Sequence, residues 1–457
     1  MRAHCMSNEF DPKEILGGFT EKIGSRQEIR QSDFDRYNIK RGLRNADGTG
    51  VMAGITKISS VEGYYIEDRE RVPKNGKLIY RGIDLYDLVA GCKEEDRFGY
   101  EELIYLLLFG ALPSKKELED FSLLLASYRE LPDDFVEDVI MRAPSPNIMN
   151  KMGSSVNALY AYDENPDDIS LGNVLRQSVM LIAQLPVIMS YAYQVKRRFY
   201  YKKSMYIHQI KPEQKTAETI LNSLRSDRKF TDAEAKLLDL CLMIHADHGG
   251  GNNSTFTTRC VTSSGTDTYS AISAGIASLK GFRHGGANIK VAEMVEQIKE
   301  SVNDITDEDE VEAFLRKIVR KQAGDGSGLI YGMGHAVYTL SDPREVLLKE
   351  NAETLAKEKG FWDDWTLLDI IERVSPRVFK EEKGLDKNIC ANVDLYSGLI
   401  YKILGIPMDL YTPMFAIARV SGWCAHRIEE IATSNKIIRP GYKSMAKNTA
   451  YIPIDLR

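Results

Sequence analysis

Four of the seven histidines in the chain lie between positions 245 and 335, and three of these four stand beside glycines. His248 and His284 each precede a run of glycines, and His335 follows Gly334. Glycine beside a polar side chain lets the backbone approach a ligand closely. Imidazole also has an ordinary pKa close to neutrality, which suits proton transfer. The pattern therefore favours a ligand site for these three histidines over the interpretation that they are ordinary hydrogen-bonded residues of the core.

The segment His245-Ala246-Asp247-His248 allows a different chemistry. Two histidines three residues apart, with an aspartate between them, can ligate zinc. The sequence places no third ligand at a typical local spacing, and it lacks the i, i+4 histidine pair with glutamate of helical zinc proteases. A metal-dependent hydrolase that uses His245, Asp247 and His248 is a remote alternative, and we expect no metal.

Three arginines stand where an anionic ligand could meet them. Arg344 lies in the first turn of the helix that Asp342-Pro343 begins. Arg419 lies inside the apolar run 414–423, and Arg439 lies near the C-terminus. A guanidinium in an apolar helix needs an anionic partner, and a substrate carboxylate supplies one through two hydrogen bonds. An internal salt bridge would satisfy the same need, so both interpretations stay open.

Two further features have weaker local signals. Asp394 comes just ahead of an apolar helix, where a plain N-cap is the favoured interpretation. The stretch from Gly324 to Gly334 holds five glycines in eleven residues. Backbone N–H groups exposed in such a loop can hold a phosphate or an adenine edge. No GK[ST] follows it and no strand precedes it, so it is neither a Walker loop nor a dinucleotide fingerprint.

Composition excludes several classes of protein. Hydrophobic residues make up 43% and charged residues 28% of the 457 residues, as in soluble globular proteins. A net charge of −6 argues against a dedicated nucleic-acid-binding protein. No uninterrupted apolar run approaches the roughly 20 residues that span a bilayer. The polar, acidic start of the chain resembles neither a signal nor a transit peptide, so we expect a cytoplasmic protein. The scattered cysteines predict reduced thiols.

The elements that must position these residues are predicted to be mostly helical, because no alternation of strands and helices is visible. The exception is one small hairpin, with strands at 61–66 and 78–80 around the turn-like segment 73–76. We therefore predict a mainly α fold with one minor β-hairpin near the N-terminus. Start and stop signals place helices at 100–109, 171–193, 235–244, 266–280, 343–360 and 412–432.

Taken together, the segments that carry these residues resemble the citrate synthase family, in order and in spacing, from about residue 50 to the end. Several independent motifs in the right order make this match far more specific than any one of them. The matching segments are YRGID (80–84), HADHGGGNNST (245–255), HGGAN (284–288), GMGHAVY (332–338) with DPR (342–344), NVDLYSG (392–398), GIP (405–407) and FAIARVSGWCAHRIE (415–429).

The resemblance implies chemical roles for three residues. His284 would hydrogen-bond the thioester carbonyl of acetyl-CoA, and Asp394 would take a proton from the methyl carbon. His335 would polarise the ketone of oxaloacetate and give a proton to the new alkoxide. The implied reaction is the condensation of acetyl-CoA, oxaloacetate and water to citrate and CoA, a step of the tricarboxylic acid cycle.

The resemblance also implies binding residues. Ser254 would orient His284, and Asn252 would support the site. The oxaloacetate site would consist of His248, Arg344, Arg419 and Arg439, the last from a partner subunit. The CoA site would consist of Leu329, Ile330, Tyr331, Gly332, Met333, Gly334 and Lys387. CoA thioester is thus a co-substrate, and no cofactor is expected to stay bound.

The family's fold implies a division of the chain. An N-terminal extension (1–55) would precede a large helical domain (56–285 and 405–457), and a small helical domain (286–404) would close over a cleft. Because Arg439 would complete a neighbour's site, we expect a homodimer or a larger homo-oligomer, without nucleic-acid or membrane partners.

Two alternatives stay within the family. A 2-methylcitrate synthase would use propionyl-CoA, and one methylene in an apolar pocket changes discrimination by only ~1–3 kcal/mol. A catalytically inactive CoA-binding relative would not need the three residues that are kept here, His284, His335 and Asp394. One departure is Gly249, which stands where many members carry glutamate, and this loosens any inference about the charge of that loop.

Overall fold

The structure is a computed structural model, and it describes residues 16–20, 29–45, 48–68, 70–384, 388–434 and 436–457. The chain separates into two compact units, residues 1–53 and 54–457. The first unit contains helix α2 (Gln31–Arg36) and the short turn η1 (Arg41–Leu43). All site residues that the sequence predicts and the structure describes lie in the second unit.

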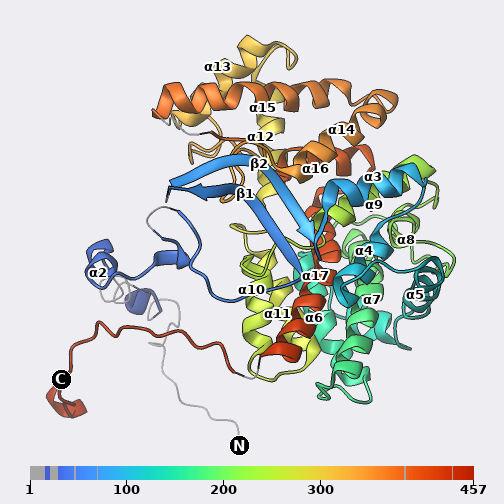
Figure 1. The fold of residues 1–457 in the computed structure, drawn as a ribbon, viewed down its shortest axis with the longest axis horizontal. Helices are drawn as coiled ribbons and strands as arrows, with labels where there is room; N and C mark the ends of the chain where they lie inside the picture. Colours follow the sequence, from blue (N-terminus) through green and yellow to red (C-terminus); the bar gives the residue numbers. More distant parts are fainter. Residues whose placement is uncertain (1–15, 21–28, 46–47, 69, 385–387, 435) are drawn as a thin grey trace, which may run out of the picture. The chain divides into compact units, whose positions relative to one another are not determined.

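The second unit is built mainly of α-helices, which confirms the predicted fold class (Figure 1). The helices are α3 (Leu85–Glu94), α4 (Tyr100–Phe109), α5 (Lys115–Ser127), α6 (Ile148–Leu159), α7 (Leu171–Phe199), α8 (Thr216–Leu224), α9 (Asp232–His245), α10 (Asn253–Thr262), α11 (Thr268–Lys280), α12 (Ala287–Ser301), α13 (Glu308–Val319), α14 (Pro343–Glu358), α15 (Trp362–Lys383), α16 (Asp394–Ile403) and α17 (Tyr411–Thr433). The shorter turns are η2 (Val136–Met141), η3 (Tyr160–Tyr162), η4 (Met408–Leu410) and η5 (Ile454–Leu456).

Local signals set the ends of the helices that lead into the site. At the start of α9, the Thr231 hydroxyl accepts the backbone N–H of Glu234, and the Glu234 carboxylate accepts that of Thr231. This capping box satisfies two otherwise unpaired N–H groups. At the start of α14, Asp342 accepts the backbone N–H of Arg344 and proline occupies the first turn. The sequence predicted the start of α14 correctly and placed the start of α9 at residue 235, three residues after its observed start at Asp232.

The β-sheet differs from the prediction at its turn. Strands β1 (Ser59–Glu67) and β2 (Glu70–Tyr80) pair antiparallel, and the short β3 (Ile83–Asp84) pairs with the end of β2. The segment 73–76 therefore lies inside β2, and the reversal falls between Glu67 and Glu70. Pro73 is tolerated because β3 pairs only with Ile79 and Tyr80, which leaves the rest of that edge of β2 unpaired.

Two long apolar helices form the core. By length and composition, α7 is the one helix among the described residues that could cross a membrane. However, 89% of its most apolar stretch is buried inside the fold. It is therefore a core helix. Helix α17 is buried along most of its length, with Trp423 wholly inaccessible. The described cysteines are all unpaired thiols, and Cys92, Cys241 and Cys424 are buried.

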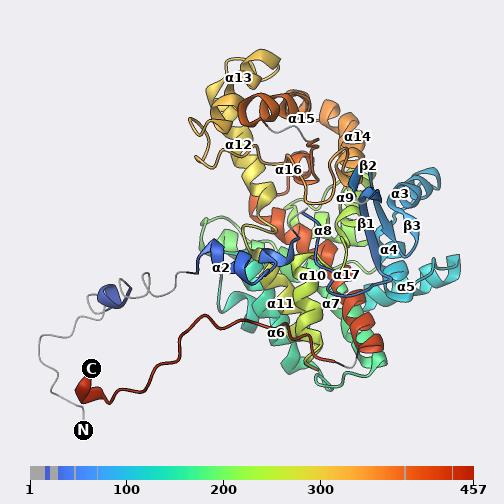
Figure 2. The ribbon, with the colours of Figure 1, turned by 60° about the vertical axis from the view of Figure 1, so that its left-hand side comes forward.

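Helices α12 to α16 gather at one end of the second unit, and α4 to α11 gather at the other end (Figures 1 and 2). Helix α12 packs on α16, α14 packs on α16 and on α9, and α17 packs on α7, α9 and α10. The β1–β2 hairpin packs on α14 through β2. These contacts bring distant parts of the chain to the predicted site. The division at residues 286–404 stays a prediction.

Candidate active site

The segment that joins α9 to α10 carries His245, Asp247 and His248, and each side chain has a different partner. His245 Nδ1 donates to the Cys241 carbonyl at 2.8 Å, and burial lowers the pKa of this imidazole to about 3. Asp247 accepts from His426 Nε2 at 3.1 Å. Within the described residues, no three His, Cys, Asp or Glu side chains are grouped to hold a metal. The metal-dependent hydrolase alternative therefore lacks a convergent ligand set.

His284 lies against the first turn of α10. Its Nε2 atom is 3.0 Å from Ser254 Oγ and accepts the Ser254 backbone N–H at 3.3 Å. The Ser254 hydroxyl in turn donates to Asn252 Oδ1 at 2.9 Å and accepts from Trp423 Nε1 at 3.1 Å. Because Nε2 is an acceptor, the ring proton is assigned to Nδ1. The predicted contact between Ser254 and His284 and the supporting contact of Asn252 are both present.

His284 is neutral at physiological pH. Burial lowers the pKa of its imidazole to about 4, and the positive charge of Arg419 lowers it further. Its ring packs on Phe415, which also contacts the guanidinium of Arg419 at 4.7 Å. A neutral imidazole with its proton on Nδ1 can donate a hydrogen bond to a carbonyl oxygen without acting as a strong acid.

His335 has the opposite ring tautomer. Its Nδ1 atom accepts the backbone N–H groups of Val337 at 3.0 Å and of Tyr338 at 3.1 Å. The proton of the neutral ring therefore sits on Nε2, the atom on the far side of the ring from the backbone. His335 packs edge-to-face against His248, with ring centroids 5.2 Å apart. Two of the predicted histidines are thus in contact.

His248 is held without a charge. Burial and the nearby Arg344 and His335 lower the pKa of its imidazole well below its ordinary value. Its Nε2 atom lies 3.3 Å from the Tyr338 hydroxyl. A neutral imidazole at this position is a polar contact for a ligand and adds no charge of its own.

Arg344 is paired inside the protein. Its Nε and Nη2 atoms donate to the two carboxylate oxygens of Asp342 at 2.9 and 2.6 Å. Burial opposes the charged form, but the Asp342 carboxylate outweighs burial and raises the pKa of the guanidinium. The salt-bridge interpretation therefore holds for Arg344, although one edge of its guanidinium makes no contact with Asp342. Asp342 is a site residue that the sequence analysis treated only as a helix cap.

Arg419 is the contrasting case. Its side chain is fully buried, and Nε donates to the His245 carbonyl at 2.7 Å. Both terminal nitrogens, Nη1 and Nη2, lack a hydrogen-bond partner among the described residues. Burial lowers the pKa of this guanidinium to about 10, against the opposing effect of Asp247. Two unpaired buried donors on a cation are costly unless an anion occupies the site, so this arrangement fits a carboxylate ligand.

Asp394 is the first residue of α16, and Val393 is the N-cap. The N-cap interpretation of Asp394 is therefore wrong. Its backbone N–H donates to Asn392 Oδ1 at 3.0 Å, and its carboxylate makes no hydrogen bond or ion pair within the described residues. Burial raises the pKa of this carboxyl to about 6, with Arg344 opposing and Asp342 adding to the rise. A carboxylate with this pKa can serve as a general base near neutrality.

The glycine-rich loop is attached to the segment that precedes Asp394. Gly334 N–H donates to the Cys390 carbonyl, and Asn392 N–H donates to the Gly332 carbonyl, both at 2.8 Å. The Asn392 side chain donates to the Gly334 carbonyl at 2.9 Å. Asn392 thus joins the loop of His335 to the helix of Asp394. It was quoted in the sequence motif, but no role was predicted for it.

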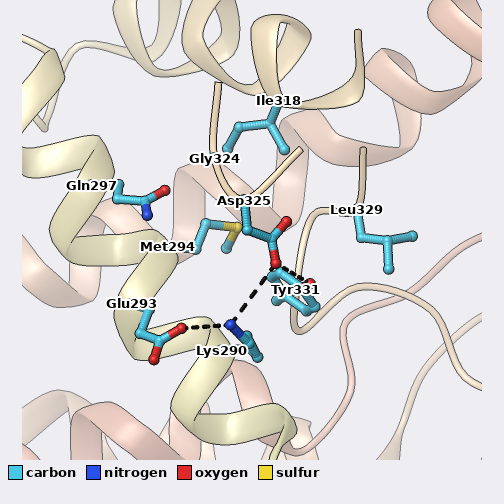
Figure 3. A pocket seen from close by; sticks show the side chains of 9 residues that line it. All are labelled: Lys290, Glu293, Met294, Gln297, Ile318, Gly324, Asp325, Leu329 and Tyr331. Atoms are coloured by element: carbon cyan, nitrogen blue, oxygen red, sulfur yellow. Dashed lines mark hydrogen bonds and ion pairs between the residues drawn. The ribbon is translucent and has the colours of Figure 1, made fainter. Parts of the chain in front are cut away.

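A small pocket of about 20 Å³ lies on the side of this loop that faces α12 (Figure 3). The Tyr331 hydroxyl donates to Asp325 at 2.6 Å, and Lys290 forms an ion pair with Glu293 at 2.8 Å. Leu329 and Tyr331, two of the residues predicted to bind CoA, line this pocket. The loop therefore combines exposed backbone with a pocket beside it.

One predicted residue stands apart from this group, and another is not described by the structure. Arg439 is exposed on the extended segment after α17, and no described contact joins it to the histidines. Lys387 lies outside the residues that the structure describes. Tyr338 is a residue that the sequence analysis missed: it is buried and contacts both His248 and His335.

The side chains of this site can together accept a proton, donate hydrogen bonds and bind an anion. Asp394 can accept a proton, His284 and His335 can donate hydrogen bonds as neutral rings, and Arg419 can bind a carboxylate. These groups suit the removal of a proton from carbon beside a carbonyl, with the enolate oxygen stabilised as it forms.

Proteins of one family are similar to this chain over most of its length. The family described as "Citrate synthase, C-terminal domain" matches residues 45–441. Citrate synthase of Haloferax volcanii is 32% identical over 428 residues, which cover 92% of this chain and 99% of that protein. Citrate synthase of Acidithiobacillus ferridurans is 34% identical over 415 residues, which cover 89% and 97%.

Solved structures have the same fold. The crystal structure of citrate synthase from Pyrobaculum aerophilum has a TM-score of 0.71 at 30% identity, and the match covers 88% of this chain and 93% of that one. Citrate synthase from Thermoplasma acidophilum, solved as a ternary complex with carboxymethyl coenzyme A and oxaloacetate, has a TM-score of 0.74 at 27% identity and covers 92% and 99%. The chain therefore belongs to the citrate synthase family of enzymes.

Proposed function

We propose that the protein condenses acetyl-CoA with oxaloacetate and water to give citrate and CoA, as an acyltransferase that converts the acyl group to an alkyl group on transfer. The observation that carries this proposal is the buried guanidinium of Arg419, whose two terminal nitrogens have no partner among the described residues. A dicarboxylate such as oxaloacetate supplies the missing anion. The Thermoplasma acidophilum relative bound oxaloacetate together with a CoA analogue.

Asp394 is the proposed base. A carboxylate is a weak base toward carbon, so the enolate oxygen must be stabilised while the proton leaves. His284 Nδ1–H is the proposed donor to that oxygen, because its Nε2 is already occupied by Ser254. The neutral state of His284 avoids a strong acid that would compete with the substrate for the Asp394 carboxylate.

The new carbon–carbon bond forms between the enolate carbon and the ketone carbon of oxaloacetate. The ketone oxygen becomes an alkoxide, and His335 gives it the proton that sits on Nε2. Water then hydrolyses the thioester of citryl-CoA and releases citrate and CoA. His248, Arg344 and Arg419 hold the substrate carboxylates, and the loop 329–334 with Lys387 holds CoA. No cofactor stays bound.

We also propose that Arg439 completes the site of a neighbouring subunit, so that the active protein is a homodimer or larger. The exposure of Arg439 on an extended segment supports this proposal. Size-exclusion chromatography with light scattering tests it, and a fully active monomer would rule it out.

The experiment that tests the function is the release of free CoA from acetyl-CoA plus oxaloacetate, with propionyl-CoA as a parallel substrate. We expect a higher kcat/KM with acetyl-CoA. A higher kcat/KM with propionyl-CoA would assign the protein as a 2-methylcitrate synthase. No CoA release with either thioester would overturn the proposed chemistry.

A further inference from the structure

Tyr338 lies between two histidines of the site, and its side chain is only 1% exposed. We propose that Tyr338 is a positioning residue that fixes His248 and His335 relative to one another, and that the β1–β2 hairpin holds it in place. This inference rests on the proposed function, because it assigns Tyr338 to the oxaloacetate side of that site.

The first contact is with His335. The Tyr338 ring stacks on the His335 ring, with centroids 4.7 Å apart and planes 24° apart. The Tyr338 backbone N–H donates to His335 Nδ1 at 3.1 Å. The same residue thus sets the plane of the imidazole and, through its backbone, the nitrogen that carries the proton.

The second contact is with His248. The Tyr338 hydroxyl lies 3.3 Å from His248 Nε2, and the two rings meet edge to face at 5.6 Å. When the hydroxyl donates to Nε2, the ring proton of neutral His248 sits on Nδ1, which is left to donate to a ligand. The Arg344 guanidinium lies 5.8 Å from the centre of the Tyr338 ring, so a third binding residue is also in contact with it.

The β1–β2 hairpin contacts Tyr338 and the loop around it. The Tyr338 hydroxyl also lies 3.3 Å from the Lys77 carbonyl of β2, and Gly76 N–H donates to Ser341 Oγ at 3.1 Å. A Cβ atom at Gly76 would lie 2.7 Å from Tyr338 Cδ1 and 2.2 Å from the Ser341 carbonyl oxygen. A Cβ atom at Gly63 of β1 would lie 2.5 Å from the Val337 carbonyl oxygen. Glycine on both strands therefore lets the loop lie directly on the sheet.

The hydroxyl and the ring of Tyr338 have different roles, because they contact different histidines. The hydroxyl reaches His248, and the ring supports His335. Tyr338→Phe removes the hydroxyl contacts with His248 and Lys77 and keeps the ring that supports His335, whereas Tyr338→Leu removes both the hydroxyl and the ring. A side chain that only filled the core would not divide its effects in this way.

The test compares wild type, Tyr338→Phe and Tyr338→Leu. We expect Tyr338→Phe to raise the KM for oxaloacetate about fivefold, the effect of one ordinary hydrogen bond, with kcat within about twofold. We expect Tyr338→Leu to lower kcat at least about tenfold as well, because the His335 ring loses its support. Tyr269→Phe is the matched control, since it removes a buried hydroxyl that donates to Asp163 at 2.6 Å and contacts no site histidine.

Crystal structures of the three proteins supply a readout that does not depend on turnover. In Tyr338→Leu, we expect the His248 and His335 rings to lose their interplanar angle of 89°. Wild-type kinetic constants in both variants would overturn the inference, as would equal effects from the Tyr269→Phe control. If wild type released no CoA at all, the proposed function would fail. In that case the crystal structure of Tyr338→Leu alone would test the positioning role of Tyr338. Rotated His248 and His335 rings would support this role, and unchanged rings would refute it.

Discussion

The backbone N–H of Ser254 donates to Nε2 of His284 at 3.3 Å, so the start of α10 faces one nitrogen of this imidazole. The first N–H groups of a helix lack partners within the helix and carry partial positive charge. Such a donor favours the neutral ring and directs its proton to Nδ1. The low pKa of His284, set mainly by burial, is consistent with this geometry.

Ser254→Ala tests this arrangement. The variant keeps the backbone donor and removes the Oγ atom that contacts His284, Asn252 and Trp423. We expect kcat to fall about tenfold, because a displaced donor stabilises the enolate less well, with the KM for oxaloacetate nearly unchanged. Steady-state kinetics with each substrate varied in turn measures both values.

Ser278→Ala is the control for Ser254→Ala. Ser278 Oγ donates to Asn253 at 2.6 Å, beside the same helix start, and does not touch His284. It should keep wild-type kcat. Equal losses in the two variants would show that the helix start, and not the contact with His284, limits turnover.

Asp394→Asn should separate catalysis from stability. The amide cannot accept a proton, so we expect kcat to fall at least about a hundredfold while oxaloacetate still binds. Burial raises the pKa of Asp394 to about 6, above its value in an unfolded chain. Its ionised form therefore costs stability at pH 7, and Asn should give an equal or higher Tm. Unchanged turnover would contradict the assignment of Asp394 as the base.

The pH dependence of kcat/KM should report the same carboxyl. Asp394 must be ionised to act, so activity should fall about tenfold per pH unit below about pH 6. Protonation of His284, with its pKa of about 4, should matter only at lower pH. Turnover measured from pH 5 to 8 tests this loss of activity at low pH, and circular dichroism confirms that the protein stays folded. A flat profile down to pH 5 would refute it.

Arg419→Met and Arg344→Met should have opposite effects on the ligand-free protein. Arg419 is a buried charge whose terminal nitrogens lack partners, so its removal should leave the Tm unchanged or raise it. Arg344 is paired with Asp342, so its removal leaves a buried carboxylate and should cost about 3 kcal/mol or more. Both variants should lose oxaloacetate binding by at least about a hundredfold in Kd. Thermal melts with and without oxaloacetate compare them.

The double variant Asp342→Asn/Arg344→Met is the control for that comparison. It removes both charges of the pair, so it should recover part of the stability that Arg344→Met loses. An Arg419→Met variant that is as unstable as Arg344→Met would mean that Arg419 has a partner in the ligand-free protein.

Gly76→Ala should impair turnover without unfolding the protein. The new Cβ would lie 2.2 Å from the Ser341 carbonyl oxygen, so the loop that carries His335 must shift. We expect kcat to fall at least about tenfold, since small displacements of reacting groups are costly. Gly91→Ala is the control, because nothing lies within 4 Å of its Cβ position in α3, and alanine should stabilise that helix by up to about 1 kcal/mol. Wild-type kcat in Gly76→Ala would argue against the inference that the β1–β2 hairpin holds the loop of His335 in place.

Local chemistry made part of this structure predictable. The start of α14 follows from an aspartate and a proline that act within one turn, and the start of α9 follows from its capping box. The turn at 73–76 was predicted wrongly because a local preference for reversal lost to cross-strand pairing along β1. The N-cap at Asp394 was also wrong, since α16 begins at Asp394 itself, one residue earlier than a capping aspartate would require.

The site was predictable in its residue types and less so in its partners. His284 and Ser254 were expected to meet, and they do. Nothing in the sequence near Tyr338 distinguishes it from an ordinary core tyrosine, because its partners His248 and Lys77 are far away in the chain. Likewise, the sequence left open that Arg344 is paired inside the protein while Arg419 is not. Such differences depend on tertiary packing.

The docking of the hairpin on the His335 loop has a consequence for how the protein folds. Gly76 and Ser341 are 265 residues apart in the chain, and Arg419 reaches a carbonyl 174 residues before it. Contacts between such distant segments close long loops and form slowly. The catalytic groups can come together only after nearly the whole chain has been synthesised. An incomplete chain therefore has no partial activity, and recovery of turnover during refolding should lag behind recovery of helix content.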